Sequence, residues 1–131
     1  MKNDEKLKIA VKNLYDAVST GDRQYLKKTI ASEGDVFCIG TDSNEFWNDR
    51  SLILENLVSQ SESGVKIAPG NINAYSEGSV GWAVDEPKFV FTNGTEVSIR
   101  MTLIFHLENE NWTMLQAHCS LGVPNSELLN R

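Results

Sequence analysis

The sequence predicts an α+β fold in which helices cover one face of an antiparallel sheet. Segments with helical periodicity occupy the first half of the chain, strand-like segments occupy the second half, and no βαβ alternation links them. The 26-residue stretch from Ile99 to Pro124 is especially informative, since two long alternating strands follow one another within it. Helices that precede a meander of strands are typical of an α+β layer architecture.

Three helices are expected before the meander. From Glu5 to Val18 apolar residues recur at helical spacing, and Gly21 follows to end the helix. Asp22 can cap a second, shorter helix, after which the chain enters an apolar strand at Val36–Ile39. A third helix is expected from about Arg50 to Gln60, with its apolar residues facing inward.

Turn residues divide the rest of the chain into strands. Glycine, proline and an Asn-Gly pair separate segments expected at residues 65–68, 71–75, 80–85, 88–91, 96–107 and 112–121. No linker, internal repeat or low-complexity tract interrupts the pattern. We therefore expect a single domain over residues 1–131.

The amino-acid composition argues against two classes of partner, nucleic acids and membranes. The chain has 12 Lys and Arg against 18 Asp and Glu, a net charge of -6, so no basic field attracts phosphate backbones and a nucleic-acid partner is not expected. No segment approaches the ~20 apolar residues that span a bilayer, and no apolar run resembles a signal peptide. The expectation is a cytoplasmic protein with no membrane partner.

Neither a cofactor nor a metal is expected. Cys38 and Cys119 lie in apolar strand-like stretches, where a reduced, buried thiol is the default. The sequence has no Gly-rich phosphate loop, Cys-x-x-Cys pair or dinucleotide fingerprint. His106 and His118 are separated by a turn and have no third ligand near them in sequence.

Three segments and the order of elements resemble one superfamily. The segments are FCIGTDSNEFWND at Phe37–Asp49, GSVGWAVDEP, and the closing RMT with WTMLQAHCS. Together they are similar to the bacterial SnoaL-like branch of the superfamily of nuclear transport factor 2 and ketosteroid isomerase. The resemblance implies a cystatin-like fold, a cone-shaped curved sheet, antiparallel or mixed, that wraps against three N-terminal helices around a conical pocket. It also implies dimers that form through the outer face of the sheet.

The closing strands also resemble the association domain of calcium/calmodulin-dependent protein kinase, an oligomerisation hub. The residues that carry this second resemblance are Thr102, His106, Trp112, His118 and Ser120. The same fold therefore serves both ligand-binding and assembly functions, and the activity has to be argued from the site.

The residues that carry ketosteroid isomerisation do not transfer to this chain. The tyrosine position of the isomerase falls on Leu14, although Tyr15 is adjacent, and the aspartic acid position falls on Leu103. Only Asp42 lies in the region of the catalytic base, displaced by about two residues. The chain departs from the isomerase at all three sites, so we do not expect steroid isomerisation.

Strand alternation places Arg100 on the outer face of the sheet, opposite the apolar set that includes Met101 and Leu103. The position of His118 depends on register. With an even turn at residues 108–111 it joins Met101 on the inner face, whereas an odd turn or a β-bulge places it with Arg100 outside. A structural role for His118 is favoured over catalysis, and Arg100 could bind a ligand carboxylate or a dimer partner.

The predicted pocket mouth contains the remaining candidates. Asp42 is the candidate base, because a carboxylate partly desolvated by neighbouring aromatic rings gains basicity; the alternative is a capping arrangement with Glu45. Trp47 and Trp82 are candidate ligand contacts, as are Tyr15 and Leu103. Asp85 and the residue after it are expected to be solvated turn charges.

Two functions remain open from the sequence. The first is the binding of a small, largely apolar molecule in a conical pocket, with isomerase-type or lyase-type acid/base chemistry carried by Asp42 and His118. The second is a non-catalytic dimerisation or assembly module that uses the outer face of the sheet. The sequence does not decide whether the protein is an enzyme.

Overall fold

The computed structural model describes residues 1–130 and confirms the α+β class. The helices, with one 3₁₀ turn, are α1 (Glu5–Thr20), α2 (Arg23–Thr29), α3 (Arg50–Ser59), η1 (Gln60–Ser63) and α4 (Asn125–Leu129). The strands are β1 (Lys2–Asn3), β2 (Phe37–Ile39), β3 (Phe46–Trp47), β4 (Lys66–Ala68), β5 (Asn73–Glu77), β6 (Val80–Asp85), β7 (Lys88–Val90), β8 (Glu96–Ser98), β9 (Arg100–Glu108) and β10 (Asn111–Ser120). Of the residues described, no helix is both long and apolar enough to cross a membrane.

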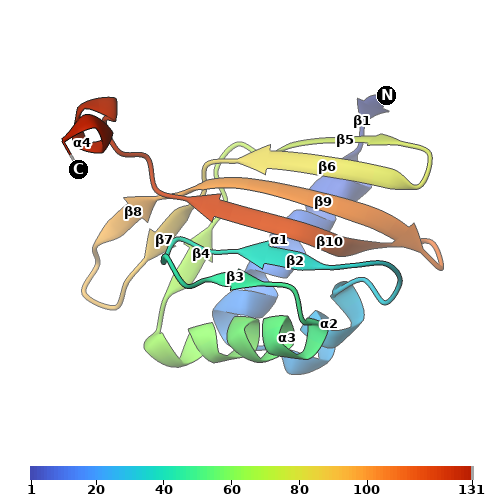
Figure 1. Cartoon of the computed structure of the whole chain (residues 1–131). Helices are drawn as coiled ribbons and strands as arrows, with labels where there is room; N and C mark the ends of the chain where they lie inside the picture. The colour runs from blue at the N-terminus through green and yellow to red at the C-terminus, as the bar shows by residue number, and fades with distance from the viewer. Residues whose placement is uncertain (131) are drawn as a thin grey trace.

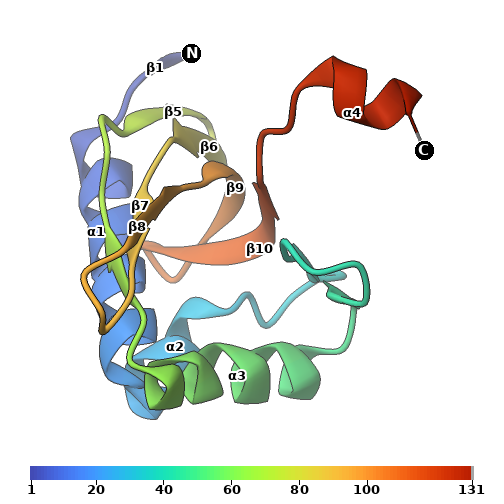
Figure 2. The same cartoon turned by 90° about the vertical axis from the view of Figure 1, so that its left-hand side faces the viewer.

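The strands form a large curved sheet and a small one. The large sheet has the order β1-β5-β6-β9-β10-β2-β3 and is antiparallel except for the parallel pair of β10 and β2. The small sheet has the order β4-β7-β8. Figures 1 and 2 show α1 behind the large sheet, with α2 and α3 below it. The fold is thus the mixed, curved sheet against N-terminal helices that the sequence predicts.

The three N-terminal helices begin at aspartate caps. The carboxylates of Asp4, Asp22 and Asp49 each accept a hydrogen bond from a backbone N–H in the first turn of α1, α2 and α3. Gly21 ends α1 in the left-handed conformation, with φ of 69°, as the sequence predicts. The apolar stripe of α1 packs against the inner face of the sheet and is buried.

The prediction of one strand over residues 96–107 is wrong in one respect, because the chain divides at Ile99 between two sheets. β8 pairs with β7 in the small sheet, whereas β9 pairs with β6 and β10 in the large one. Ile99 lies at the break with only 3% of its surface exposed, and its N–H donates to the carbonyl oxygen of Pro87. The burial of this side chain at the corner allows one continuous apolar segment to serve both sheets.

A β-bulge in β10 decides which side chains face inward. A two-residue turn, Asn109 and Glu110, joins β9 to β10 and pairs Glu108 with Asn111, so the turn alone would place His118 opposite Met101. The register shifts by one residue between Met114 and Gln116, and beyond the shift His118 pairs with Thr102. His118 therefore lies on the outer face of the sheet, the second of the two positions that the sequence left open.

Candidate functional site

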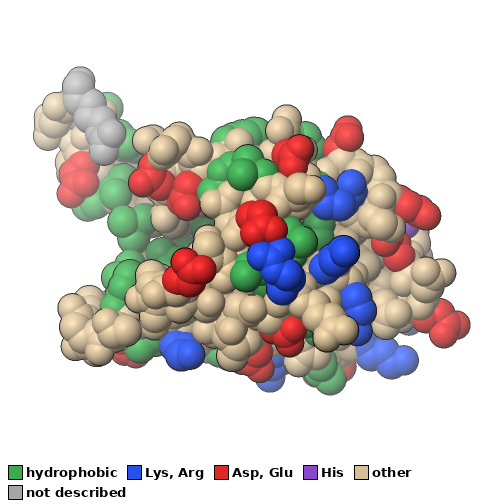
Figure 3. Space-filling view, turned by 90° about the horizontal axis from the view of Figure 1, so that it is seen from below, with side chains coloured by type: hydrophobic (Ala, Val, Ile, Leu, Met, Phe, Trp, Pro, Cys, Tyr) green, Lys and Arg blue, Asp and Glu red, His purple; other side chains and the backbone are tan. Residues whose placement is uncertain are grey.

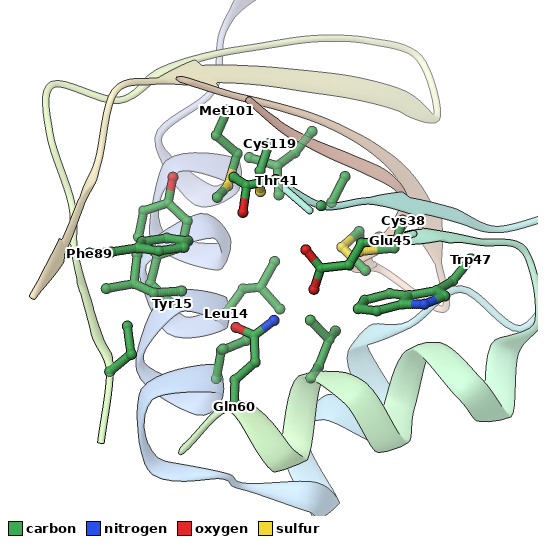
Figure 4. Close-up of a pocket in the computed structure, with 18 of the residues that line it drawn as sticks. Leu14, Tyr15, Cys38, Thr41, Glu45, Trp47, Gln60, Phe89, Met101 and Cys119 are labelled. Atoms are coloured by element: carbon green, nitrogen blue, oxygen red, sulfur yellow. The ribbon is translucent and has the colours of Figure 1, made fainter. Parts of the chain in front are cut away.

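An apolar pocket of about 300 Å³ lies between α1, η1 and the inner face of the sheet (Figure 4). Its apolar lining comes from two helices and six strands and their flanking loops: Leu14, Tyr15, Val18, Cys38, Trp47, Leu57, Val65, Ile67, Phe89, Phe91, Met101, Leu103, Met114, Ala117 and Cys119. The more polar lining residues are Gly40, Thr41, Glu45, Gln60 and Ser63. A concave apolar space with a few polar groups is the usual form of a small-molecule site.

Glu45 supplies the charge in this pocket, and no Lys, Arg or His is found among the lining residues in the described part of the chain. A tight turn holds it in place. The Gly40 N–H donates to the Glu45 carbonyl oxygen at 2.8 Å, and the Glu45 N–H donates to the Asp42 carbonyl oxygen at 3.0 Å. The Asp42 N–H in turn donates to Glu45 Oε1 at 2.8 Å. Figure 4 shows the carboxylate directed into the cavity, above Gln60 and beside Trp47.

Asp42 itself does not line the pocket. Its side chain is exposed, and its Oδ1 accepts a hydrogen bond from the Asn44 N–H at 3.2 Å. This local bond, together with the bond from its own N–H to Glu45, resembles the capping arrangement that the sequence suggested as the alternative to catalysis, although it closes a turn and caps no helix. The turn therefore directs Glu45 inward and leaves Asp42 in solvent.

Tyr15 forms one wall of the pocket and joins a buried carboxylate behind it. Its hydroxyl donates to Asp85 Oδ2 at 2.8 Å. Asp85 is only 5% exposed, so the expectation of a solvated turn charge is wrong. Burial and the bond to Asp85 hold the pKa of Tyr15 well above its ordinary value, and the phenol stays protonated.

Backbone donors at a glycine complete this buried arrangement. The N–H of Gly70 donates to Asp85 Oδ2 at 3.2 Å and the N–H of Glu86 donates to Oδ1 at 2.8 Å. A Cβ at position 70 would lie 2.5 Å from the Glu86 carbonyl oxygen, so the close approach requires glycine. In the sequence, Gly70 indicates only a turn between two expected strands. Its contact with the end of β6 is not evident there, because that contact depends on the pairing of segments that are distant in the chain.

Two thiols share the pocket wall with Glu45. Cys38 on β2 lies opposite Ala117 of β10, and Cys119 lies two residues further along the same inner face. Burial raises the pKa of Cys38 to about 11 and that of Cys119 to about 12, with the Glu45 charge adding to both shifts. Both are free thiols, as expected, and both are protonated at neutral pH.

The other ligand-contact candidates divide between two faces of the sheet. Trp47, Tyr15 and Leu103 all line the pocket. Trp82 does not, because it alternates with the buried residues of β6 and therefore points outward. There it stacks on Tyr75 with ring centroids 5.9 Å apart. The pocket contact predicted for Trp82 is wrong for this reason.

Arg100 and His118 lie together on the outer face, away from the pocket. Arg100 Nε donates to Ser120 Oγ at 3.2 Å, and His118 is on the same face, beside an open hollow of about 550 Å³. The alternation of β9 places Arg100 there, and the bulge in β10 places His118 there. The structure therefore separates Asp42 from Arg100 and His118, and none of the three lines the pocket.

One further polar cluster lies at the far end of β9. Ligand atoms of Glu33, His106 and Glu108 lie within 4.8 Å of one another. The carboxylate of Glu108 accepts hydrogen bonds from the N–H and hydroxyl of Ser32 and from the N–H of Glu33. Although burial opposes it, these bonds hold the pKa of Glu108 below its ordinary value. These hydrogen bonds connect the α2–β2 loop to β9 and so give the cluster a structural role.

Solved structures share this fold at low sequence identity. A proposed dehydratase of the nuclear transport factor 2-like family from Streptomyces avermitilis has a TM-score of 0.79 and 16% identity over 92% of this chain and 96% of that one. A nuclear transport factor 2-like protein with a cystatin-like fold from Novosphingobium aromaticivorans gives 0.73 and 15%, over 97% and 88%. The association domain of calcium/calmodulin-dependent protein kinase II from C. elegans gives 0.71 and 13%, over 88% and 93%.

These similarities show the fold, and the family follows from the sequence itself. No curated protein matches the chain. The model of the SnoaL-like domain family, by contrast, matches residues 7–124, nearly the whole chain. The chain belongs to the family of SnoaL-like domains.

Proposed function

We propose that this protein binds a small, largely apolar molecule in the pocket between α1 and the sheet. The observation that carries the proposal is the lining, in which apolar side chains from two helices and several strands surround about 300 Å³ with a few polar groups at fixed places. Burying an apolar ligand there gains about 25 cal/mol for each Å² removed from water. The mixed but mostly apolar wall fits a ligand with one polar end.

Acid/base chemistry in this pocket would centre on Glu45 in place of Asp42. Glu45 Oε1 is held by the Asp42 N–H, which orients the carboxylate toward the cavity. A carboxylate in an apolar site can remove a proton from a bound molecule and return it to a neighbouring atom, the proton transfer of isomerases and lyases. The candidate role of Asp42 is then to position Glu45 through its backbone.

A neutral fluorescent probe, N-phenyl-1-naphthylamine, tests the binding proposal. Ala117 lies on the inner wall and its neighbour Gln116 points outward, so Ala117→Leu fills the pocket and Gln116→Leu is the matched control. We expect Ala117→Leu to weaken probe binding by about tenfold or more, because the added methyl groups occupy ligand space. Fluorescence titration measures the dissociation constants, and circular dichroism verifies the fold.

The proposal fails if the wild-type protein does not bind the probe. It fails equally if both variants bind it as the wild type does, since the probe would then occupy another surface.

A second function, homodimerisation through the outer face of the large sheet, is favoured by an apolar stripe there. The stripe consists of five side chains on β5, β6 and β9: Tyr75, Val80, Trp82, Val84 and Ile104. Val80, Val84 and Ile104 are 45%, 47% and 36% exposed, unusually high for apolar side chains grouped on one sheet face. The relative named as an association domain uses this fold for assembly. The stripe supports a dimer in which two sheets pack face to face.

Static light scattering at micromolar concentration tests the dimer. We expect twice the chain mass for the wild type, and the mass of one chain for Ile104→Glu, because a charge in the centre of an apolar interface costs more than the interface gains. Ile9→Glu on α1 is the control, since Ile9 is equally apolar and 54% exposed but lies off the stripe. A wild-type protein with the mass of one chain contradicts the dimer.

A further inference from the structure

The carboxylate of Glu45 has no cationic partner among residues 1–130. No ion pair involves it, and no basic side chain lines the pocket around it. One oxygen accepts the Asp42 N–H at 2.8 Å, which leaves the other without a protein donor in the described structure. A carboxylate beside an apolar wall is stabilised by a cation or a strong hydrogen-bond donor. A ligand with a cationic or strongly hydrogen-bond-donating group can therefore supply the partner that the Glu45 carboxylate lacks.

Aromatic rings line the pocket both beside Glu45 and across the cavity from it. Trp47, Tyr15, Phe89 and Phe91 all line the pocket. In Figure 4 the Trp47 indole lies beside the Glu45 carboxylate, and Tyr15 and Phe89 form the opposite wall. Aromatic faces attract ammonium groups, and the attraction grows when water is excluded. Carboxylate and rings together favour the same kind of ligand group.

The electrostatic surroundings of Glu45 disfavour a negatively charged ligand. Burial, with the Glu45 charge adding to it, raises the pKa of both pocket thiols, so the thiols stay neutral and Glu45 supplies the charge of the lining. The whole chain carries a net charge of -6. In Figure 3 apolar side chains line a hollow at the end that carries α4, acidic side chains flank it, and most Lys and Arg side chains in that view lie elsewhere. Such a field draws in cations and repels anions.

We propose that the pocket takes an apolar amine, whose protonated nitrogen contacts the free oxygen of Glu45 and whose hydrocarbon body lies among the aromatic and sulfur-containing side chains. This inference rests on the proposed binding function and specifies its ligand class. Sulfur atoms of Met101, Met114, Cys38 and Cys119 line the same cavity and make favourable contacts with aromatic rings. An aromatic or polycyclic amine fits both parts of the site.

Three molecules of nearly equal shape test the inference. They are 1-naphthylmethylamine, 1-naphthalenemethanol and 1-naphthoic acid, with a positive, neutral and negative polar end at pH 7. Isothermal titration calorimetry is expected to show the amine binding about tenfold or more tightly than the alcohol, and the acid more weakly than both. Glu45→Gln is expected to remove the advantage of the amine and leave the alcohol within about twofold, because the amide oxygen still accepts the Asp42 N–H.

Glu110→Gln at the β9–β10 turn is the matched control, since it makes the same change of net charge far from the pocket. Equal affinities for amine and alcohol overturn the amine inference, as does an amine preference that survives Glu45→Gln. In both cases, measurable binding of the alcohol would still support the proposed binding function. If none of the three molecules and no neutral fluorescent probe binds, both proposals fail.

Discussion

Leu103→Ala is expected to lower the free energy of unfolding by about 2–5 kcal/mol, since the side chain is 1% exposed and its removal leaves space that the surrounding strands cannot close. Leu103 lies at the centre of β9, where it faces Ala83 on one side and Ala117 on the other. Both neighbours are small, so little can move into the vacated volume. Urea denaturation monitored by circular dichroism measures the loss.

Leu52→Ala is the matched control for this prediction. Leu52 is 47% exposed on α3, and the same chemical change there is expected to alter stability by about 0.5 kcal/mol or less. A loss at Leu103 no larger than the loss at Leu52 would show that the inner wall relaxes around the cavity, contrary to the packing described.

Asp85→Ala is expected to lower the free energy of unfolding by about 3 kcal/mol, because each buried donor left unpaired costs about 1–3 kcal/mol. The substitution removes the acceptor for the Tyr15 hydroxyl and for the backbone N–H groups of Gly70 and Glu86. Glu86→Ala, one residue away and exposed, should change stability by about 0.5 kcal/mol or less. Equal effects of the two substitutions would contradict the role given to Asp85.

The pH dependence of stability provides a second readout of the same pair. The pKa of Tyr15 is raised in the folded protein, so its contribution is fully present below about pH 10, the ordinary value for tyrosine, and is lost as pH rises through the folded-state value. Urea midpoints at pH 8 and above pH 10 should therefore fall less steeply for Tyr15→Phe than for the wild type. The thiols of Cys38 and Cys119 act in the same direction and are present in both proteins. Identical slopes would mean that the phenol ionises equally in both states.

Local patterns predicted the three N-terminal helices, and for physical reasons, whereas α4 was not predicted. The aspartate caps, the apolar stripe of α1 and Gly21 are interactions within a few residues, so they can be read from sequence. β6 was predicted with its observed bounds, because turn residues flank it on both sides. The division of the chain at Ile99 was missed, since continuous apolar alternation does not reveal that two sheets share the segment.

The site was predicted less completely because it depends on distant contacts. Tyr15 and Trp47 were identified as pocket residues by their size and position. Glu45 was interpreted only as a capping partner of Asp42, because the inward direction of a side chain in a turn is set by tertiary packing. Asp85 was assigned to solvent, since its burial depends on Tyr15, 70 residues away in the chain.

The single extra residue in β10 has a consequence for the chemistry of the pocket wall. If β10 kept the register that the two-residue turn sets, Leu115 would pair with Ile104, and the two faces of the strand beyond it would be exchanged. Cys119 would then leave the pocket, and His118 and Ser120 would enter it beside Glu45. The bulge thus keeps a thiol, in place of an imidazole and a hydroxyl, on the inner wall. The strand encodes two alternative pocket chemistries, and the bulge selects between them.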